Sequence, residues 1–197
     1  MGQAYTENAF LDPATGQFTM RTCFVKGTKI QTIHGQKSIE EIKAGDLVLS
    51  WNQRSGVKSY NKVNQTFIRE ANEIYTIRYS NGAAIQTTWS HRFWINEKGW
   101  VEAKDLKPGN RSPMATGASQ QIESVTVKPG EETVYNFSVE NDETYFAGDD
   151  GVLVHNDRYS ANLTALLSMV YEKTPGSSKE KLKEIIAASN KLPDVRL

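Results

Sequence analysis

The chain has little or none of several features that define large classes of protein. It has a single cysteine, Cys23, so no disulfide bond can form within it. Lysine and arginine together number 23, as do aspartate and glutamate, so no net charge directs the chain to nucleic acid or to an anionic membrane. No apolar run approaches the roughly 18 residues of a membrane-spanning helix, and residues 1–22 contain no apolar signal core. We therefore expect either a cytosolic protein or a piece of a longer exported chain.

Helical periodicity is also nearly absent before residue 156. Short alternating or β-branched runs predict strands at 28–33, 47–51, 57–69, 74–79, 84–88, 93–96, 100–103, 121–127 and 134–139. The dipeptide Asn81-Gly82 indicates a hairpin between two of them. Only residues 40–43 and 103–106 favour helical turns, the first within a capping-box pattern. The length allows one mainly β domain of about 130 to 150 residues with appendages.

An internal repeat lies within the β-rich region. Residues 34–46 align without gaps with residues 98–110. Three aligned pairs are identical: Gly35/Gly99, Lys43/Lys107 and Gly45/Gly109. Because glycines set turns, both copies are expected to build the same unit of strand, turn, short helix and strand. We therefore predict a duplicated, pseudo-symmetric β domain.

The pattern changes after Asn156. Leucine and valine recur at helical spacing in 159–173, a Thr-Pro-Gly break follows, and a second helix is expected to run to Asn190. We predict three parts: an N-terminal flanking segment (1–22), a β domain (23–156) and a small C-terminal helical segment (157–197).

The β domain ends in an apolar run followed by His155 and Asn156. An asparagine side-chain nitrogen can attack its own carbonyl carbon, close a succinimide and release the next residue. A neighbouring histidine supplies the general acid and base for this reaction at neutral pH. The pair alone is a weak signal, because a strand end beside a polar turn explains it equally well.

Cys23 suggests a second reaction at the other end of the domain. In an N-to-S acyl shift its sulfur attacks the carbonyl of Thr22, and the amide becomes a thioester. The reaction needs a donor to the tetrahedral oxyanion and a proton for the departing nitrogen. His91 is expected to give that proton, and Thr88 to hold the carbonyl or to orient His91.

In this order the motifs resemble the Hint (hedgehog/intein) superfamily, most closely pretoxin Hint domains and bacterial intein-like domains. The resemblance is carried by residues 23–28, 39–49, 88–91 and 134–156. It implies a horseshoe-shaped, pseudo-two-fold β fold and autocatalytic cleavage of the host chain. It also implies a larger exported bacterial protein in which the segment from Asp157 begins a released cargo, such as a toxin.

Three positions depart from the family pattern. Residue 157 is Asp where a splicing intein has Cys, Ser or Thr, which favours independent cleavage at the two ends over splicing. Asn136 stands where inteins often carry Asp, and Glu143 where the family frequently has His. For Glu143, an acid/base role and a place as an exposed turn carboxylate both stay open.

The main hypothesis is a self-cleaving, single-turnover domain that acts on its own chain as a monomer, without cofactor, metal, nucleic acid or membrane. Its predicted catalytic residues are Cys23, Thr88, His91, His155 and Asn156. One alternative is an inactive structural Hint domain that spaces two parts of a longer protein. Another is a zinc site at Cys23, His91 and His155, although no CxxC-like or HxxxH-like spacing supports it. The third histidine, His34, is expected on the surface.

Overall fold

The computed structural model describes residues 9–11, 18–20 and 22–155, and they fall in two compact units. In the first, β1 (Ala9–Leu11) pairs antiparallel with β2 (Phe18–Met20). The second contains residues 22–155. The helices expected after residue 156, and Asn156 itself, lie outside the described residues. Nowhere in the described ranges does a helix have the length and apolar character needed to cross a membrane.

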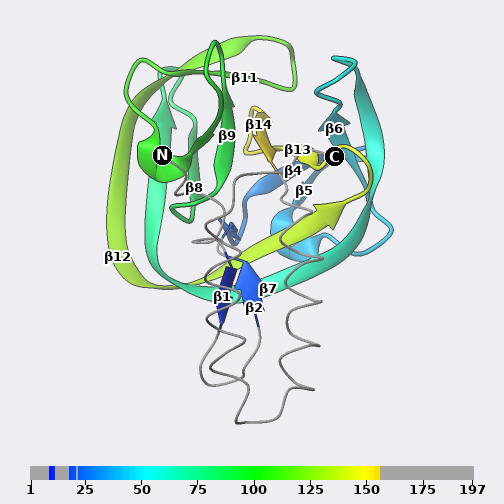
Figure 1. Cartoon of the computed structure of the whole chain (residues 1–197), viewed down its shortest axis with the longest axis horizontal. Coiled ribbons are helices and arrows are strands. Elements are labelled where there is room, and N and C mark those ends of the chain that lie inside the picture. Colours follow the sequence, from blue (N-terminus) through cyan, green and yellow to red (C-terminus); the bar gives the residue numbers. More distant parts are fainter. Residues whose placement is uncertain (1–8, 12–17, 21, 156–197) are drawn as a thin grey trace, which may run out of the picture. The chain divides into compact units, whose positions relative to one another are not determined.

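Residues 22–155 form one antiparallel sheet of 12 strands, which confirms the prediction of a mainly β fold (Figure 1). The strands are β3 (Phe24–Val25), β4 (Lys29–Thr32), β5 (Gly35–Ser38), β6 (Leu47–Trp51), β7 (Lys58–Tyr79), β8 (Ala84–Thr87), β9 (Arg92–Ile95), β10 (Gly99–Glu102), β11 (Arg111–Pro113), β12 (Ser119–Val139), β13 (Thr144–Ala147) and β14 (Val152–His155). Within these residues the helical elements are two 3-10 turns, η1 (Ile39–Glu41) and η2 (Ala103–Asp105).

Two long strands replace four shorter predicted ones. The predicted strands at 57–69 and 74–79 are one strand, β7, and those at 121–127 and 134–139 are one strand, β12. No residue of β7 between Val63 and Ile74 is fully buried. This part of the strand therefore needs no alternation of apolar and polar residues, and the sequence shows no apolar period there. The two strands pair with each other instead, and Figure 1 shows them curving together around the shorter strands.

The sequence repeat is a structural repeat. β5 and η1 match β10 and η2 residue for residue along the alignment of 34–46 with 98–110. Gly45 and Gly109 both have left-handed backbones, with φ of 96° and 91°, a conformation that favours glycine. Each turn is closed by a backbone N–H that donates to a side-chain oxygen three residues later: Lys43 to Asp46 at 2.8 Å and Lys107 to Asn110 at 3.1 Å.

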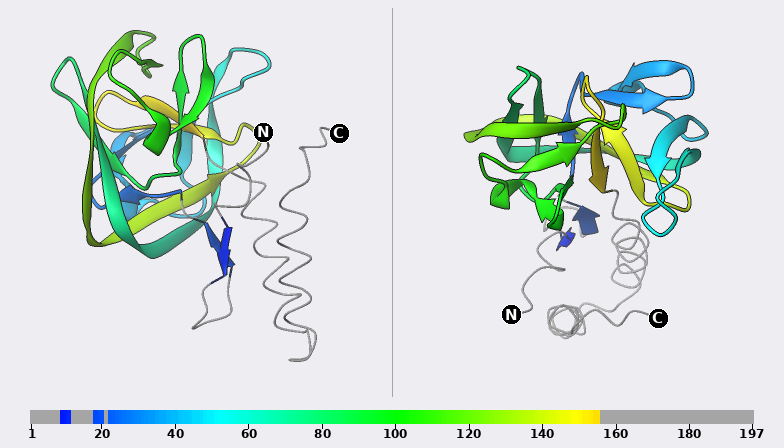
Figure 2. Two further views of the ribbon diagram at one scale, coloured as in Figure 1. Left: turned by 60° about the vertical axis from the view of Figure 1, so that its left-hand side comes forward. Right: turned by 90° about the horizontal axis from the view of Figure 1, so that it is seen from above.

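The strands that end the domain lie inside the sheet rather than at its edge. Strand β14 pairs with β13 on one side and with β9 on the other. Figure 2 shows this hairpin between the green strands and the blue-to-cyan strands. The core around it is aromatic, because Phe24, Phe93, Phe137 and Tyr145 are each 0% exposed. Buried aromatic side chains of this size dominate core stability and exclude water from the groups beside them.

Candidate active site

Strand pairing brings the beginning of the domain to the predicted histidine motif. Phe24 of β3 pairs with Thr87 of β8, so Cys23 lies beside Thr88, the residue that follows β8. On its other side β3 pairs with β12 through Tyr135 and Phe24. One position further along that register, Asn136 of β12 faces Cys23. Antiparallel pairing thus assembles residues that are more than sixty positions apart in the sequence.

Threonines hold the Cys23 backbone, including the nitrogen of the Thr22–Cys23 peptide bond. The Cys23 N–H donates to Oγ1 of Thr88 at 2.9 Å, and the Thr88 N–H donates back to the Cys23 carbonyl at 3.0 Å. The Thr87 hydroxyl also donates to the Cys23 carbonyl, at 2.7 Å. The Thr88 hydroxyl thus contacts the nitrogen that leaves in an acyl shift.

The carbonyl side of the same bond is held by Asn136. Its Nδ2 donates to the Thr22 carbonyl oxygen at 2.6 Å. Its Oδ1 accepts hydrogen bonds from the Phe137 N–H at 2.8 Å and from the Tyr145 hydroxyl at 3.1 Å. A fixed donor at this oxygen is what stabilises a developing oxyanion. The sequence marked Asn136 only as a departure from the family pattern, and a clearer signal was its position as an amide in an inward-facing apolar strand.

His91 is enclosed by aromatic rings. It is 0% exposed, and its ring centroid lies 4.1 Å from that of Phe24, 5.9 Å from Phe93 and 6.3 Å from Tyr145. Burial, together with positive charge on His155 and Arg92, lowers the pKa of His91 to about 3. Neither ring nitrogen has a hydrogen-bond partner among the described residues. At neutral pH His91 is therefore a neutral base, which must collect a proton before it can donate one.

Cys23 is buried as an uncharged thiol. It is 1% exposed and packs against Ile74 and Val134. Burial raises the pKa of its thiol to about 12, although the positive charge of Arg69 acts in the opposite direction. Since the thiolate is the nucleophilic form, attack on Thr22 requires that a base remove the thiol proton as the bond forms.

His155 ends β14 beside a row of tryptophans. Its ring centroid lies 4.8 Å from that of Trp100, which lies 5.0 Å from Trp94, which in turn lies 5.1 Å from Trp51. Because charge on His155 influences the pKa of His91, the two imidazoles are electrostatically coupled. The next residue, Asn156, lies outside the described residues, so the structure shows the C-terminal site only as far as His155.

The remaining sequence interpretations have mixed outcomes. His34 is exposed, as expected. Glu143 follows the bend after β12, has a left-handed backbone with φ of 53° and is partly buried, so both interpretations of it stay open. No cluster of three or more His, Cys, Asp or Glu side chains within the described residues is arranged to hold a metal ion, so the zinc alternative gains no support.

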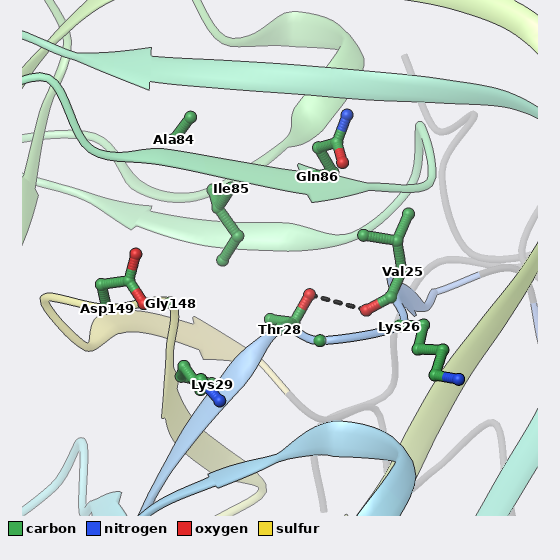
Figure 3. Close-up of a pocket in the computed structure, with 10 residues that line it drawn as sticks. Val25, Lys26, Thr28, Lys29, Ala84, Ile85, Gln86, Gly148 and Asp149 are labelled. Carbon is green, nitrogen blue, oxygen red and sulfur yellow. Dashed lines mark hydrogen bonds between the residues drawn. The ribbon is translucent and has the colours of Figure 1, made fainter.

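A surface pocket of about 220 Å³ is separate from these groups (Figure 3). Residues 25–29, 84–86 and 148–149 line it, and the Ile85 side chain extends from β8 into the space between these segments. Cys23, Thr88, His91 and His155 are not among its lining residues. Cys23, Thr88 and His91 are buried in the core, whereas His155 is partly exposed.

The comparisons with known proteins agree with the resemblance noted in the sequence. The model of the pretoxin HINT domain family matches residues 29–157. Among solved structures, a bacterial intein-like domain from Clostridium thermocellum is 36% identical with a TM-score of 0.65, and the match covers 68% of this chain and 98% of that one. The gp41-1 intein (26% identity, TM-score 0.58) and a DnaB intein from Synechocystis sp. PCC 6803 (20%, 0.60) each match over 68% of this chain and 98% of their own. The DnaB intein, at 20% identity, is evidence for the fold alone. No curated protein matches the chain.

Proposed function

Because the chain belongs to the pretoxin HINT domain family, we propose that residues 23–156 are a self-cleaving domain. Cys23 converts the Thr22–Cys23 peptide bond to a thioester, and Asn156 cyclises to release the segment that begins at Asp157. The observation that carries this proposal is that the Thr22–Cys23 peptide bond is hydrogen-bonded at both its carbonyl and its N–H. Its carbonyl accepts a hydrogen bond from Asn136 at 2.6 Å, and its N–H donates to Thr88 at 2.9 Å.

The acyl shift is an isomerisation that needs no other reactant. The Cys23 sulfur forms a bond to the Thr22 carbonyl carbon, the carbon–nitrogen bond breaks, and the thiol proton ends on the Cys23 nitrogen. Burial and nearby positive charge keep the His91 imidazole neutral, so it can accept the thiol proton. Because a pKa of about 3 makes it a weak base, the proton is held only in passing and moves on to the Cys23 nitrogen. The Thr88 hydroxyl lies at the nitrogen that receives a proton. Asn136 donates to the oxygen on which negative charge develops.

The second reaction follows from the residues at the end of the domain. The Asn156 side-chain nitrogen attacks its own carbonyl carbon, the bond to the Asp157 nitrogen breaks, and a proton passes to the new amine. His155, at the end of β14, is the neighbouring acid and base. Since Asp157 has no thiol or hydroxyl to accept the acyl group from Cys23, the two cuts are independent and splicing is not efficient.

The family name suggests what the cuts serve. Pretoxin HINT domains are named for toxin precursors, so the segment from Asp157 is proposed as the start of a cargo in a polymorphic toxin protein. The domain acts on its own chain. Its catalytic residues are Cys23, Thr88, His91, His155 and Asn156, to which the geometry adds Asn136.

The intact mass of the purified chain, followed for hours at neutral pH with and without a small thiol, tests the proposal. The wild-type chain should break after Asn156, and thiol should release residues 1–22. Asn156→Ala should lose the first cut and keep the second, whereas Cys23→Ala should do the reverse. Unchanged full-length mass in the wild type would instead favour an inactive structural domain, and a product joining Thr22 to Asp157 would mean splicing.

A further inference from the structure

The Asn136 side chain uses every hydrogen bond that an amide can make. Its Nδ2 donates to two atoms of Thr22, the carbonyl oxygen at 2.6 Å and Oγ1 at 3.3 Å. Its Oδ1 accepts from Phe137 and Tyr145. An asparagine amide has two N–H donors and one oxygen that accepts two bonds, so no capacity is left over.

This arrangement fixes which way the amide points. The Phe137 N–H can only donate, so a flipped amide would set two donors against each other. Tyr145 is 0% exposed, and both burial and the nearby Cys23 raise the pKa of its phenol well above the ordinary value. Tyr145 therefore stays protonated and donates to Oδ1, which makes it a positioning residue. The Nδ2 of Asn136 is left facing Thr22.

Thr22 is enclosed together with its partner. It is 2% exposed, as is Asn136. If residue 22 had no hydroxyl, one N–H of Asn136 would face a dry space without an acceptor. A buried donor without a partner is costly. Because Phe137 and Tyr145 hold Oδ1, the amide would not flip, but a tilt about Oδ1 toward another acceptor would weaken its hydrogen bond to the carbonyl. The side chain before the scissile bond is therefore part of the geometry that serves the reaction.

We propose that Asn136 determines specificity for the residue on the acyl side of the scissile bond, and that it selects a side chain with a β-hydroxyl of the size of threonine. This inference rests on the proposed acyl shift at Cys23. Flanking segments that end in threonine or serine are accepted. Valine has nearly the same shape as threonine, yet a segment that ends in valine is processed slowly, because the hydrogen bond from Asn136 to the carbonyl is then weakened.

The test compares rates of thiol-induced release of residues 1–22, measured by intact mass with dithiothreitol on the full chain carrying Asn156→Ala. Thr22→Val should slow release about tenfold, whereas Thr22→Ser should change it by less than about threefold. In an Asn136→Ala background, the segments that end in threonine and in valine should be released at equal rates. The two changes would then be coupled rather than additive. Tyr145→Phe should reduce the difference in release rate between the chains with threonine and with valine at position 22, because one donor that orients the Asn136 amide is lost.

The possible outcomes distinguish the proposed preference for residue 22 from the acyl shift at Cys23. Equal release from the chain with threonine at position 22 and from its Thr22→Val variant overturns the specificity and leaves the acyl shift intact. So does a valine effect that persists undiminished in the Asn136→Ala background, because it does not then pass through the amide. No release from the chain that keeps Thr22, with thermal unfolding showing a folded protein, overturns the acyl shift itself and the specificity with it.

Discussion

Asn136 presents a hydrogen-bond donor to the Thr22 carbonyl, whereas an ionised aspartate would present a negative charge. The amide donates a hydrogen bond to the carbonyl oxygen at 2.6 Å, whereas an ionised carboxylate at the same place would repel the oxyanion. The amide does not titrate, so in the proposed acyl shift proton transfer is left to His91 and to the Thr88 hydroxyl beside the Cys23 nitrogen. Where inteins often carry Asp, this chain thus has a donor that keeps its protons at neutral pH.

Asn136→Asp should slow thioester formation at neutral pH by about 10²-fold, because loss of one oxyanion donor has an effect of this size. Burial would raise the pKa of the new carboxyl. Part of the rate should therefore return as the pH falls and the carboxyl becomes a protonated donor. The measurement is the rate of thiol-induced release of residues 1–22 against pH. A variant that matches the wild-type rate at neutral pH would show that Asn136 is not the oxyanion donor.

His91 should make the stability of the domain depend on pH. Burial holds its pKa at about 3 in the folded protein, below the ordinary value of about 6.5. The stabilising contribution of the neutral ring is thus complete above pH 6.5 and is lost as the pH falls from 6.5 towards 3. Over that range its loss should reduce the free energy of unfolding by about 1.4 kcal/mol per pH unit.

Urea unfolding at several pH values measures this slope. His91→Phe keeps an aromatic ring in the core and cannot titrate, so its slope should be smaller than that of the wild type by about 1.4 kcal/mol per pH unit. Identical slopes in the two proteins would mean that folding does not shift the pKa of His91, which would contradict its desolvation in the core.

At the scale of elements, the sequence predicted those whose residues alternate or whose turns need glycine. The strand predicted at 47–51 is β6 (Leu47–Trp51), and Asn81-Gly82 lies in the turn between β7 and β8 as expected. The two predicted helical turns are the 3-10 turns η1 and η2. Local patterns suffice for such elements because the signal and the structure occupy the same few residues.

Other features depend on contacts between distant residues, and the sequence did not reveal them. The middle of β7 is mostly exposed and continues as a strand only because β12 pairs with it. The role of Asn136 follows from the register of β12 against β3, which no local pattern specifies. The burial of His91 likewise depends on Phe24, Phe93 and Tyr145, which come from three separate strands.

The two matched turns predict matched effects on stability. Gly45 and Gly109 have positive φ, and an added Cβ would meet no atom within 4 Å at either site, so alanine there introduces backbone strain alone. Gly45→Ala and Gly109→Ala should each lower the free energy of unfolding by about 1 to 3 kcal/mol, measured by urea denaturation. Lys107→Ala, at an exposed side chain in the second turn, should change it by less than about 0.5 kcal/mol. Clearly unequal effects of the two glycine variants would contradict a shared turn geometry.

At the scale of the described domain, the duplicated sheet explains why the two predicted reactions belong together. Pairing of β3 with β8 and β12 sets the upstream peptide bond beside Thr88 and Asn136. Pairing of β14 with β9 brings His155 within electrostatic range of His91. One core thus serves both ends of the domain, while Asp157 breaks the chemical link that splicing would need.

Because the scissile bond is buried, the proposed acyl shift and the release of residues 1–22 have different requirements for access. Thr22 is 2% and Cys23 1% exposed, so a thioester between them would be shielded from water and from external thiols. The acyl shift needs no access from outside, because both reacting groups belong to the chain. Release of residues 1–22 needs a nucleophile to reach the thioester through local opening of the fold, so at a given thiol concentration its rate rises with the fraction of chains that hold the thioester.

Trapping with hydroxylamine tests the central claim most directly, since this small nucleophile converts a thioester to a hydroxamate. The full chain carrying Asn156→Ala should yield two masses at neutral pH: residues 1–22 ending in a Thr22 hydroxamate, and a chain that begins with Cys23. The same chain with Cys23→Ala should stay whole. An Asn156→Ala chain that remains intact, or a Cys23→Ala chain that yields the same fragments, would contradict a Cys23 thioester.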